Sequence, residues 1–232
     1  MKQLYEGKAK IIYEGGPEEV LIYFKDDTTA GNGEKKASIA GKGVLNNQIS
    51  TILLRYLEEH GIQTHLLESV DDRTMRCRKT RVLPLEVIVR NYAAGSMVRR
   101  LGMKRGEAFA HPLVEFSYKN DALGDPLIND DHAIALGIAT GEELRQIRSE
   151  ALLINSLLST RFTSIGITLV DFKIEFGKTS DDQLLLVDEI SGDTCRLWNA
   201  DQLSFDKDLF REDSGDLIAG YETIHRLLKE HN

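Results

Sequence analysis

The sequence predicts an α+β fold, in which antiparallel sheets and helices occupy separate stretches of the chain. Strand-like alternation of apolar and polar residues marks residues 4–24 and returns over residues 62–92. Helical spacing is strongest over residues 140–166, and strands and helices do not alternate as they do in a parallel sheet. We expect an N-terminal β-rich lobe over residues 1–80 and a larger C-terminal α+β lobe over residues 81–232.

The N-terminal lobe begins with predicted β structure from Leu4 to Phe24. The segment from Gly7 to Lys10 forms a glycine-containing turn between two of these strands. A polar loop is expected from Lys25 to Lys36, with Gly31 and Gly33 inside it.

The first predicted helix runs from Leu45 to Leu57, where apolar residues recur every three or four positions. Gly61 stands where a helix-ending glycine is common. Strands are expected over residues 62–68, 74–79 and 83–92, because apolar and polar residues alternate there.

The C-terminal lobe is predicted to contain more helix. A short helix is expected over residues 96–101, and residues 102–131 are expected to be mostly irregular. Residues 140–143 have the spacing of a capping box and open a long amphipathic helix that is closed by Gly166. A β-hairpin and a helix over residues 218–229 follow.

The composition is that of an ordinary globular protein. Of 232 residues, 41% are hydrophobic and 28% are charged, which is enough apolar sequence to offset the entropy of folding. The net charge of −8 argues against non-specific nucleic-acid binding, and no apolar run reaches the roughly 18–20 residues that span a bilayer. The first residues lack the apolar stretch of a signal peptide, and Cys77 and Cys195 form no CxxC pair, so we expect reduced thiols in a cytoplasmic protein.

A cluster of basic residues near residue 80 leaves two interpretations open. Because the residues alternate, they can form one charged face of a solvated strand. A nucleic-acid site is the weaker interpretation, because no aromatic residues that could stack on bases are interleaved. The residues are Arg73, Arg76, Arg78, Lys79 and Arg81.

The most informative stretch is a predicted hairpin of two strands, Leu169 to Gly177 and Leu184 to Glu189. Alternate residues of a strand share a face, so Asp171, Lys173 and Glu175 are expected to project together. The residues expected to face the core are Val170, Phe172, Ile174 and Phe176.

The register of this hairpin predicts a metal site. A turn centred on Asp181 and Asp182 places Glu175 opposite Asp188, with Cβ atoms about 4.5–5.5 Å apart. Like charges so placed repel each other unless a cation joins them, and Mg²⁺ takes one or two carboxylates with water and substrate phosphates. Lys173 would contact a phosphoryl oxygen or orient Glu175. The alternative is a solvated hairpin face whose charges have no function.

Two further segments have the residue types of anion sites. The turn that holds Lys8 and Lys10 can lie over a polyphosphate, or can be an ordinary exposed turn. Arg90 lies on a strand that leads into Gly95 and Ser96 at a helix start, which is the setting of a phosphate-monoester site. In the alternative, Ser96 is a helix cap and Arg90 forms an internal salt bridge. Arg196 is either a second anion contact or surface packing near a tryptophan.

Three motifs occur in order along the chain: Pro84 to Ser96, Val170 to Gly177 and Asp188 to Trp198. Together they resemble the SAICAR synthetase family of de novo purine biosynthesis, and the resemblance extends from Leu4 to the C-terminal helix. It implies an ATP-grasp-like two-lobed fold with ATP and Mg²⁺ between the lobes. It also implies an enzyme that joins L-aspartate to the carboxylate of carboxyaminoimidazole ribotide (CAIR), giving SAICAR, ADP and phosphate. Members commonly self-associate, so a homodimer is expected.

The resemblance implies roles for residues at both ends of the site. Lys8 and Lys10 would lie over the ATP phosphates, and the segment Lys79–Glu86 would line the adenine pocket. Glu175 and Asp188 would hold magnesium, and Asp188 would also face the nucleotide.

For CAIR, the resemblance implies contacts from Arg90, Gly95, Ser96 and Arg196. Asp171 and Lys173 would lie at the reacting end, where Lys173 would also face ATP, and Arg196 would position the substrate for reaction.

The aspartate site and one loop are the weaker parts of the likeness. The family usually has Ser-Pro-Asp where this chain has a glycine, Gly192, between Ser191 and Asp193, so we expect a looser loop and a less defined position for Arg196. Candidates for binding L-aspartate are Asp27, Thr28, Thr29, Lys119, Asn120 and Asp121.

The expected chemistry is transfer of the ATP γ-phosphoryl group to the CAIR carboxylate, followed by attack of the aspartate amine on the acyl phosphate, with Asp171 as a candidate base. Two alternatives stay open. An ATP-dependent phosphotransferase acting on a small metabolite would use the same lysines and carboxylates. A nucleotide-binding regulatory module would bind ATP without chemistry.

Overall fold

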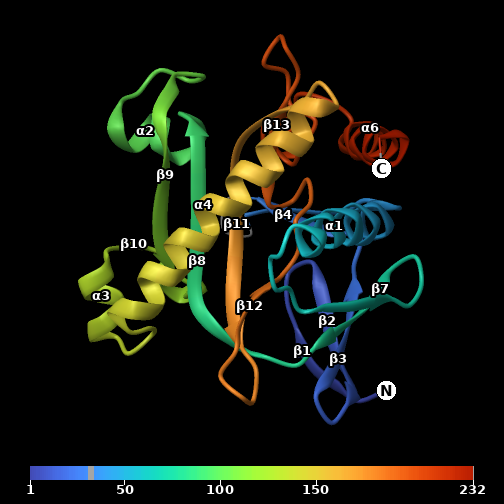
Figure 1. The fold of residues 1–232 in the computed structure, drawn as a ribbon. Helices are drawn as coiled ribbons and strands as arrows, with labels where there is room; N and C mark the ends of the chain where they lie inside the picture. The colour runs from blue at the N-terminus through green and yellow to red at the C-terminus, as the bar shows by residue number, and fades with distance from the viewer. Residues whose placement is uncertain (31–33, 232) are drawn as a thin grey trace.

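The computed structural model, which describes residues 1–30 and 34–231, begins with an antiparallel sheet in the order β1-β2-β3-β7-β6 (Figure 1). The helix α1 (Lys42–Glu59) packs on β3, β6 and β7. It covers the predicted span, and Gly61 follows it with φ 88°, as expected of a helix-ending glycine. The strands of this sheet are β1 (Gln3–Glu6), β2 (Lys10–Gly16), β3 (Glu19–Phe24), β6 (Leu66–Ser69) and β7 (Thr74–Arg78).

The predicted polar loop after β3 is wrong, because it contains a two-stranded sheet. The strands β4 (Asp27–Ala30) and β5 (Lys35–Ser38) pair antiparallel. They are rich in Thr and Lys and carry no apolar alternation, so only the backbone pairing identifies them. The expected loop glycines Gly31 and Gly33 lie outside the described residues.

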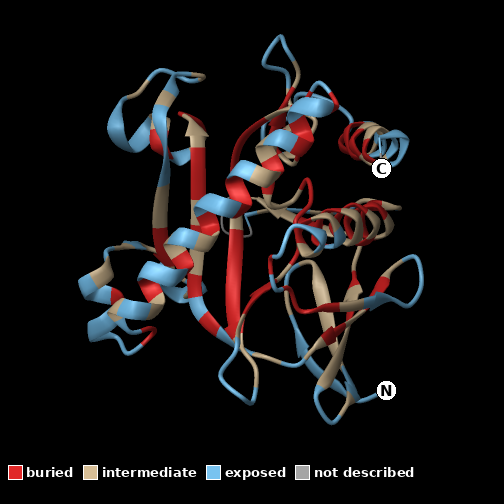
Figure 2. Cartoon of the chain, in the orientation of Figure 1, coloured by how far each residue is buried: buried red, intermediate tan, exposed pale blue. Residues whose placement is uncertain are grey.

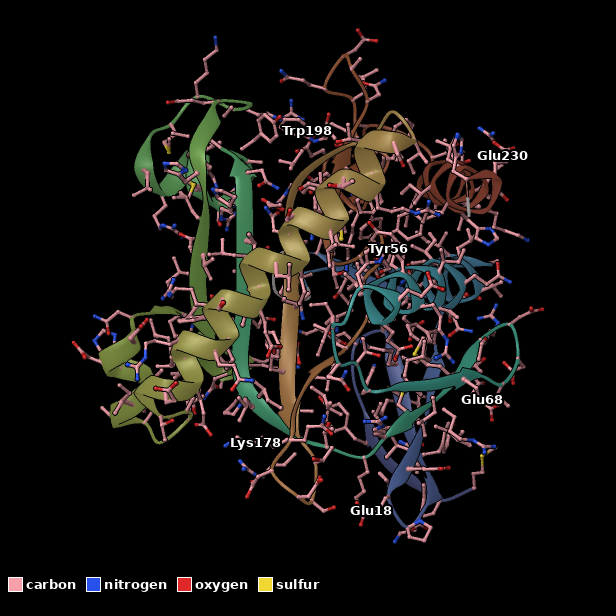
Figure 3. All side chains as sticks on the ribbon, in the orientation of Figure 1. Glu18, Tyr56, Glu68, Lys178, Trp198 and Glu230 are labelled. Carbon is pink, nitrogen blue, oxygen red and sulfur yellow. The ribbon has the colours of Figure 1, made fainter. Side chains whose placement is uncertain are left out.

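The second large sheet has the order β10-β9-β8-β11-β12, and β13 pairs with β11. Figure 3 labels Lys178 at one end of β11 and Trp198, from β13, near the other. The strands are β8 (Arg81–Tyr92), β9 (Ala108–Tyr118), β10 (Leu127–Ile128), β11 (Thr168–Lys178), β12 (Leu184–Val187) and β13 (Cys195–Trp198).

The prediction of irregular structure over residues 102–131 is also wrong, because this stretch contains the long strand β9. Pro112 breaks the sequence signal, since proline cannot donate to a β ladder. The structure tolerates it where the β8–β9 register is irregular, between Arg90 and Tyr92. The partner on the other side, β10, pairs only with Phe116 and Ser117, so the Pro112 part of β9 lies at the sheet edge.

The helices follow the prediction closely in the C-terminal part. Thr140 and Glu143 form the predicted capping box, each side chain accepting from the other's backbone N–H. The helix α4 crosses β8, β9 and β11 and turns its apolar side toward them (Figure 2). The helices are α2 (Ser96–Leu101), α3 (Asp130–Ala135), α4 (Gly141–Ser164), α5 (Asp208–Arg211) and α6 (Leu217–Glu230), with a 3₁₀ turn, η2 (Asp121–Leu123). The sequence pattern does not predict α3, α5 or η2.

The chain passes from the first sheet to the second between Arg78 and Arg81, the position that the sequence assigns to the lobe boundary. The hydrophobic core is continuous across this passage, from Phe24 of β3 through Leu53 of α1 to Phe172 of β11. The C-terminal α6 packs on α1. In the described part of the chain, every helix is too short or too polar to cross a membrane.

The predicted register of the β11–β12 hairpin is wrong by one residue. Glu175 pairs with Val187 instead of Asp188, because the loop between Lys178 and Leu184 has an odd number of residues and cannot be centred on two. A left-handed residue in the loop, Asp182 with φ 62°, helps to close it.

The face assigned to Val170 also needs correction. The pairing of β11 with β13 is irregular between Leu169 and Asp171. Val170 therefore packs in a small separate cluster with Ala94 and Trp198, while Phe172 and the other predicted core residues of β11 lie in the main core.

Candidate active site

A pocket of about 150 Å³ lies on the second sheet, against β8, β11 and β13. Its walls are rich in charged side chains, and five of the residues expected at the site take part: Glu86, Arg90, Asp171, Lys173 and Arg196. The other lining residues are Ile88, Phe172, Asp193, Thr194, Cys195 and Arg211.

At one end of the pocket, Asp171 lies between two arginines. Its carboxylate accepts from Arg90 Nη1 at 2.8 Å and from Arg196 Nη1 at 2.9 and 3.0 Å. Arg90 also donates from Nε to Glu115 at 2.6 Å. Arg90, Arg196 and Asp171 together form the arginine group. Each guanidinium carries five N–H groups, and the carboxylates occupy only some of them. The remaining N–H groups are fixed donors for an anion such as a phosphate monoester.

The start of α2 meets this arginine group. Gly95 precedes the helix with φ 55°, and a Cβ built there would lie 2.4 Å from Arg196 Nη2. Only glycine therefore allows the guanidinium to lie against the backbone at this point. Ser96 accepts a long hydrogen bond from Arg90 Nη2 at 3.4 Å. The structure thus brings together Arg90, Gly95, Ser96 and Arg196, the residues for which the family resemblance implies contacts with CAIR.

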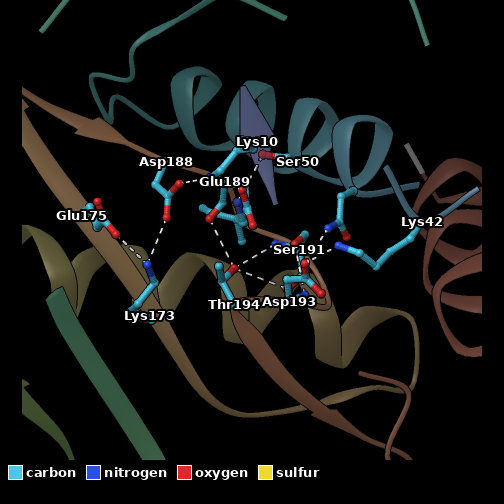
Figure 4. Close-up of polar contacts among 12 residues, drawn as sticks. Lys10, Lys42, Ser50, Lys173, Glu175, Asp188, Glu189, Ser191, Asp193 and Thr194 are labelled. Carbon is cyan, nitrogen blue, oxygen red and sulfur yellow. Dashed lines mark hydrogen bonds and ion pairs between the residues drawn. The ribbon is translucent and has the colours of Figure 1, made fainter. Parts of the chain in front are cut away.

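At the other end of the pocket wall, Lys173 joins two carboxylates (Figure 4). Its ammonium lies 2.6 Å from Glu175 Oε1 and 3.0 Å from Asp188 Oδ2, and 3.5 Å from Glu86. Lys119 contacts the second oxygen of Glu175. The two carboxylates converge despite the shifted register, because Asp188 has a left-handed backbone, φ 69°, that turns its side chain back toward Glu175.

Lys10 reaches this group from the first sheet. Its ammonium forms ion pairs with Asp188 and Glu189 and lies 5.8 Å from the ring centre of Phe24. The side chain of Lys10 is partly buried, and its charge is balanced by the two carboxylates that follow β12, across the boundary between the sheets.

Lys10, Lys173, Glu175, Asp188 and Glu189 together form the lysine–carboxylate group. For Lys173 and Asp188, opposite charges outweigh burial. Burial disfavours the charged form of Lys173, but Asp188, Glu175 and Glu86 raise its pKa well above the ordinary value. Burial likewise opposes ionisation of Asp188, but Lys10 and Lys173 hold its pKa well below the ordinary value. Lys173 and Asp188 are therefore charged near neutral pH.

The same group fits a divalent cation. A single ammonium already reaches oxygens of both Glu175 and Asp188 within 3.0 Å. Within residues 1–30 and 34–231, no three His, Cys, Asp or Glu side chains gather as a metal cage. Mg²⁺ is commonly held by one or two carboxylates together with substrate phosphates and water, so this oxygen pair suits it and would be its protein ligands.

Two further predicted site residues, Lys8 and Lys79, do not line the pocket. Lys8 pairs with Asp121 at 2.6 Å, linking the β1–β2 turn to η2. Lys79 is exposed, and its backbone N–H donates to Glu18. Among the aspartate candidates, Lys119 and Asp121 are thus engaged near the second sheet.

Three other aspartate candidates, Asp27, Thr28 and Thr29, belong to β4 in a different sheet, whereas Asn120 adjoins Lys119 and Asp121 in the chain. Asp27 pairs with Lys25 at 3.0 Å, and Thr28 is buried in β4 with its hydroxyl lacking a partner in the described part of the chain. Among residues 1–30 and 34–231, no hydrogen bond or ion pair joins Asp27 or Thr28 to Lys119 or Asp121.

Several charged residues at the site were missed by the sequence reasoning. Asp208 accepts from Arg196 Nε at 2.8 Å and pairs with Arg211, so it orients two arginines of the pocket. Lys42 is fully buried and pairs with Asp193 at 2.6 Å. Only Glu189, directly after Asp188, carried a signal that could have been used.

The expected loosening of the loop at Gly192 is not what the structure shows. A Cβ at Gly192 would lie 2.3 Å from Cε1 of Tyr221, so the glycine allows close packing of this ring. The Tyr221 hydroxyl donates to Asp193 at 2.7 Å, and Lys42 and Asn46 donate to the same carboxylate. Arg196, three residues on, therefore follows a firmly held segment.

Comparisons with known proteins all indicate the same family. The family model described as SAICAR synthetase matches residues 3–227. The chain is 54% identical to the phosphoribosylaminoimidazole-succinocarboxamide synthase of Finegoldia magna, over 97% of each chain, and 49% identical to that of Staphylococcus aureus, over 99% of each. Its fold matches the crystal structure of the synthase from Ehrlichia chaffeensis with a TM-score of 0.96, at 42% identity and 98% coverage of both chains. It matches a SAICAR synthetase in complex with ADP with a TM-score of 0.94, at 46% identity, covering 97% of this chain and 96% of the other.

Proposed function

This chain belongs to the SAICAR synthetase family, and we infer that it is an ATP-dependent ligase of de novo purine biosynthesis. It joins L-aspartate to the carboxylate of CAIR, giving SAICAR, ADP and phosphate. The observation that carries this function is the arrangement along β11: Asp171 holds the arginine group, and Lys173 and Glu175 belong to the lysine–carboxylate group. Alternate residues of a strand are about 7 Å apart on one face, so an anionic substrate and a nucleotide would meet there.

We assign the nucleotide to the lysine–carboxylate group. Lys8 and Lys10 belong to the turn and strand that face the second sheet, and their present partners are carboxylates, which nucleotide phosphates would replace. The segment Lys79–Glu86 joins the two sheets and is our candidate for the adenine pocket. The relative bound to ADP supports the choice of nucleotide.

We propose Mg²⁺ as the metal, held by Glu175 and Asp188. When bound with ATP, it would neutralise charge on the phosphates that are transferred and released. Lys173 touches both carboxylates and would contact the transferred phosphoryl group.

We assign CAIR to the arginine group. Arg90, Arg196 and Ser96 would bind the ribotide phosphate, and Gly95 provides room for Arg196. Arg211 lies in the same pocket and adds positive charge. Asp171 accepts hydrogen bonds from both arginines, which favours a role in orienting them over a role as the base for the amine.

The proposed reaction needs alignment and charge neutralisation more than a protein nucleophile. A CAIR carboxylate oxygen bonds to the γ-phosphorus while the bond to the β-phosphate oxygen breaks and ADP leaves. The aspartate amine then attacks the acyl carbon, the bond to the phosphate oxygen breaks, and the amine loses a proton. Asp27, Thr28, Lys119 and Asp121 are our candidates for holding L-aspartate.

We further propose a cytoplasmic homodimer. Both cysteines are free and buried, which suits a reducing compartment. Exposed apolar side chains on and beside α3, such as Ile134 and Leu136, suit contact with a second copy.

The function is tested by measuring ADP release with CAIR and L-aspartate each left out in turn. We expect full turnover only with both. Turnover that continues without aspartate would indicate a phosphotransferase instead, and ATP binding without any CAIR-dependent ADP release would indicate a regulatory module.

The acyl phosphate predicts positional isotope exchange. With ATP labelled at the oxygen that bridges the β- and γ-phosphates, we expect the label to scramble when CAIR is present and aspartate is absent, because the phosphoryl transfer is reversible. The distribution is measured by phosphorus NMR. Omitting CAIR is the control, and absence of scrambling with CAIR would favour a concerted route.

A further inference from the structure

Asp206 is a buried carboxylate close to Arg196 that the proposed reaction does not use. Its exposed fraction is 0%. One carboxylate oxygen accepts from the backbone N–H of Leu197 at 2.7 Å, and the other accepts from the backbone N–H of Asp208 at 2.8 Å. Among residues 1–30 and 34–231, no ion pair includes Asp206, so both oxygens are bound to backbone groups instead of to a cation.

The two donors belong to different elements. Leu197 lies in β13 directly after Arg196, and Asp208 is the first residue of α5. The helix α5 has only four residues, and a helix of this length is not stable without contacts to the rest of the fold. Asp206 therefore helps to fix the start of α5 against β13.

Arg196 closes a ring with these residues. Its Nε donates to Asp208 Oδ2 at 2.8 Å, while its Nη1 donates to Asp171. Arg211 donates to the other oxygen of Asp208 at 2.5 Å. The carboxylate of Asp208 thus decides where the Arg196 guanidinium lies, and the backbone of Asp208 is itself held by Asp206.

Close packing keeps water away from this ring. The N–H of Phe205 donates to the carbonyl of Leu197 at 2.9 Å, which brings the chain back beside β13. A Cβ built at Gly220 of α6 would lie 2.5 Å from the carbonyl oxygen of Phe205, so α6 packs directly on the backbone next to Asp206. Because the site is buried, water cannot easily replace a hydrogen bond that is lost here.

We propose that Asp206 is a positioning residue that sets the orientation of the Arg196 guanidinium in the pocket. It holds the backbone after Arg196 through Leu197, and it holds the side chain through Asp208. This inference rests on the proposed binding of CAIR by Arg196. It assigns to Asp206 no contact with substrate, and Asp206 does not line the pocket.

The test is a double-mutant cycle on kcat/KM for CAIR. Asp206→Ala removes both acceptors, and we expect kcat/KM to fall about tenfold. In a chain that already carries Arg196→Ala, the same substitution should lower kcat/KM by less than about threefold, because the guanidinium that Asp206 positions is gone. The affinity for ADP, measured by calorimetry, should stay close to the parent value in all these variants.

Two results would overturn the proposal. One is a parent value of kcat/KM in Asp206→Ala. The other is an equal fall with and without Arg196, which is the result expected if Asp206 only stabilises the fold. If Asp206→Ala does not fold, Asp206→Asn takes its place in the cycle, because it keeps the shape of the side chain and one acceptor oxygen; the same two results would then decide.

Asp216→Ala is the matched control. The Asp216 carboxylate also accepts from two backbone N–H groups, those of Ile218 at 2.9 Å and Ala219 at 3.2 Å, at the start of α6. This variant should lower the Tm, because it removes a helix cap, and should leave kcat/KM for CAIR at the parent value.

Arg196→Ala by itself separates the two levels of the argument. It should lower kcat/KM for CAIR by about 100-fold, because charge-assisted hydrogen bonds to the substrate are lost. If it leaves kcat/KM at the parent value, the proposed binding of CAIR by Arg196 is wrong. If it lowers kcat/KM while Asp206→Ala does not, only the role of Asp206 is wrong.

Discussion

Replacing Glu175 with Gln, or Asp188 with Asn, is expected to abolish turnover while the chain stays folded. Each change keeps the shape of the side chain and removes one negative charge from the pair that would hold the metal. Loss of several kcal/mol of charge stabilisation corresponds to a rate lower by about 1,000-fold or more. The rate is measured as CAIR- and aspartate-dependent ADP release.

The fold should survive because the neighbouring charges keep partners. Without the charge of Glu175, Lys173 still pairs with Asp188. Without that of Asp188, Lys10 still pairs with Glu189. We expect both variants to unfold cooperatively, within a few degrees of the parent Tm.

Asp181→Asn serves as the control for charge removal, because Asp181 lies exposed in the loop of the same hairpin, where its carboxylate accepts a hydrogen bond from Thr179. It should turn over at the parent rate. Parent rates in Glu175→Gln or Asp188→Asn would remove both residues from the metal site.

The second large effect is expected from Arg90→Ala combined with Ser96→Ala. The pair should raise the KM for CAIR by about 100-fold, because charge-assisted hydrogen bonds to a phosphate contribute about 1.5–3 kcal/mol each. ADP binding should change far less, since neither residue contacts the lysine–carboxylate group. The readouts are steady-state kinetics for CAIR and calorimetry for ADP.

A neighbouring arginine provides the control. Arg100 pairs with the same Glu115 as Arg90 but does not line the pocket. Arg100→Ala should leave the KM for CAIR close to the parent value. If the double variant weakens ADP and CAIR binding equally, the assignment of the phosphate site is wrong.

Local patterns identified elements whose residues interact with near neighbours in the sequence. The capping box from Thr140 to Glu143 predicted the start of α4, because both hydrogen bonds form within one turn. The strand β9 was missed because Pro112 resembles a break, and its tolerance depends on where β8 and β10 lie. Pairing partners decide such a strand, and they are distant in the sequence.

At the site, the β11–β12 hairpin likewise separates what local patterns predict from what tertiary contacts decide. Alternation along β11 correctly indicated that Asp171, Lys173 and Glu175 project from the same face of the strand. The register was wrong by one residue, and the left-handed backbone of Asp188 restored the convergence that the wrong register had predicted. The odd length of the loop moved Asp188 out of register with Glu175, and the left-handed backbone of Asp188 turned its side chain back. No periodicity in the sequence reveals either effect.

The sequence by itself determined which side chains line β8 and β11 and which family motifs they form, because strand alternation and motif spacing are local. The tertiary structure alone decided which charges are partners. Lys42 has the sequence context of a surface lysine, yet it is fully buried against Asp193. Such pairs form only when packing removes both charges from water together, since either one buried alone would be too costly.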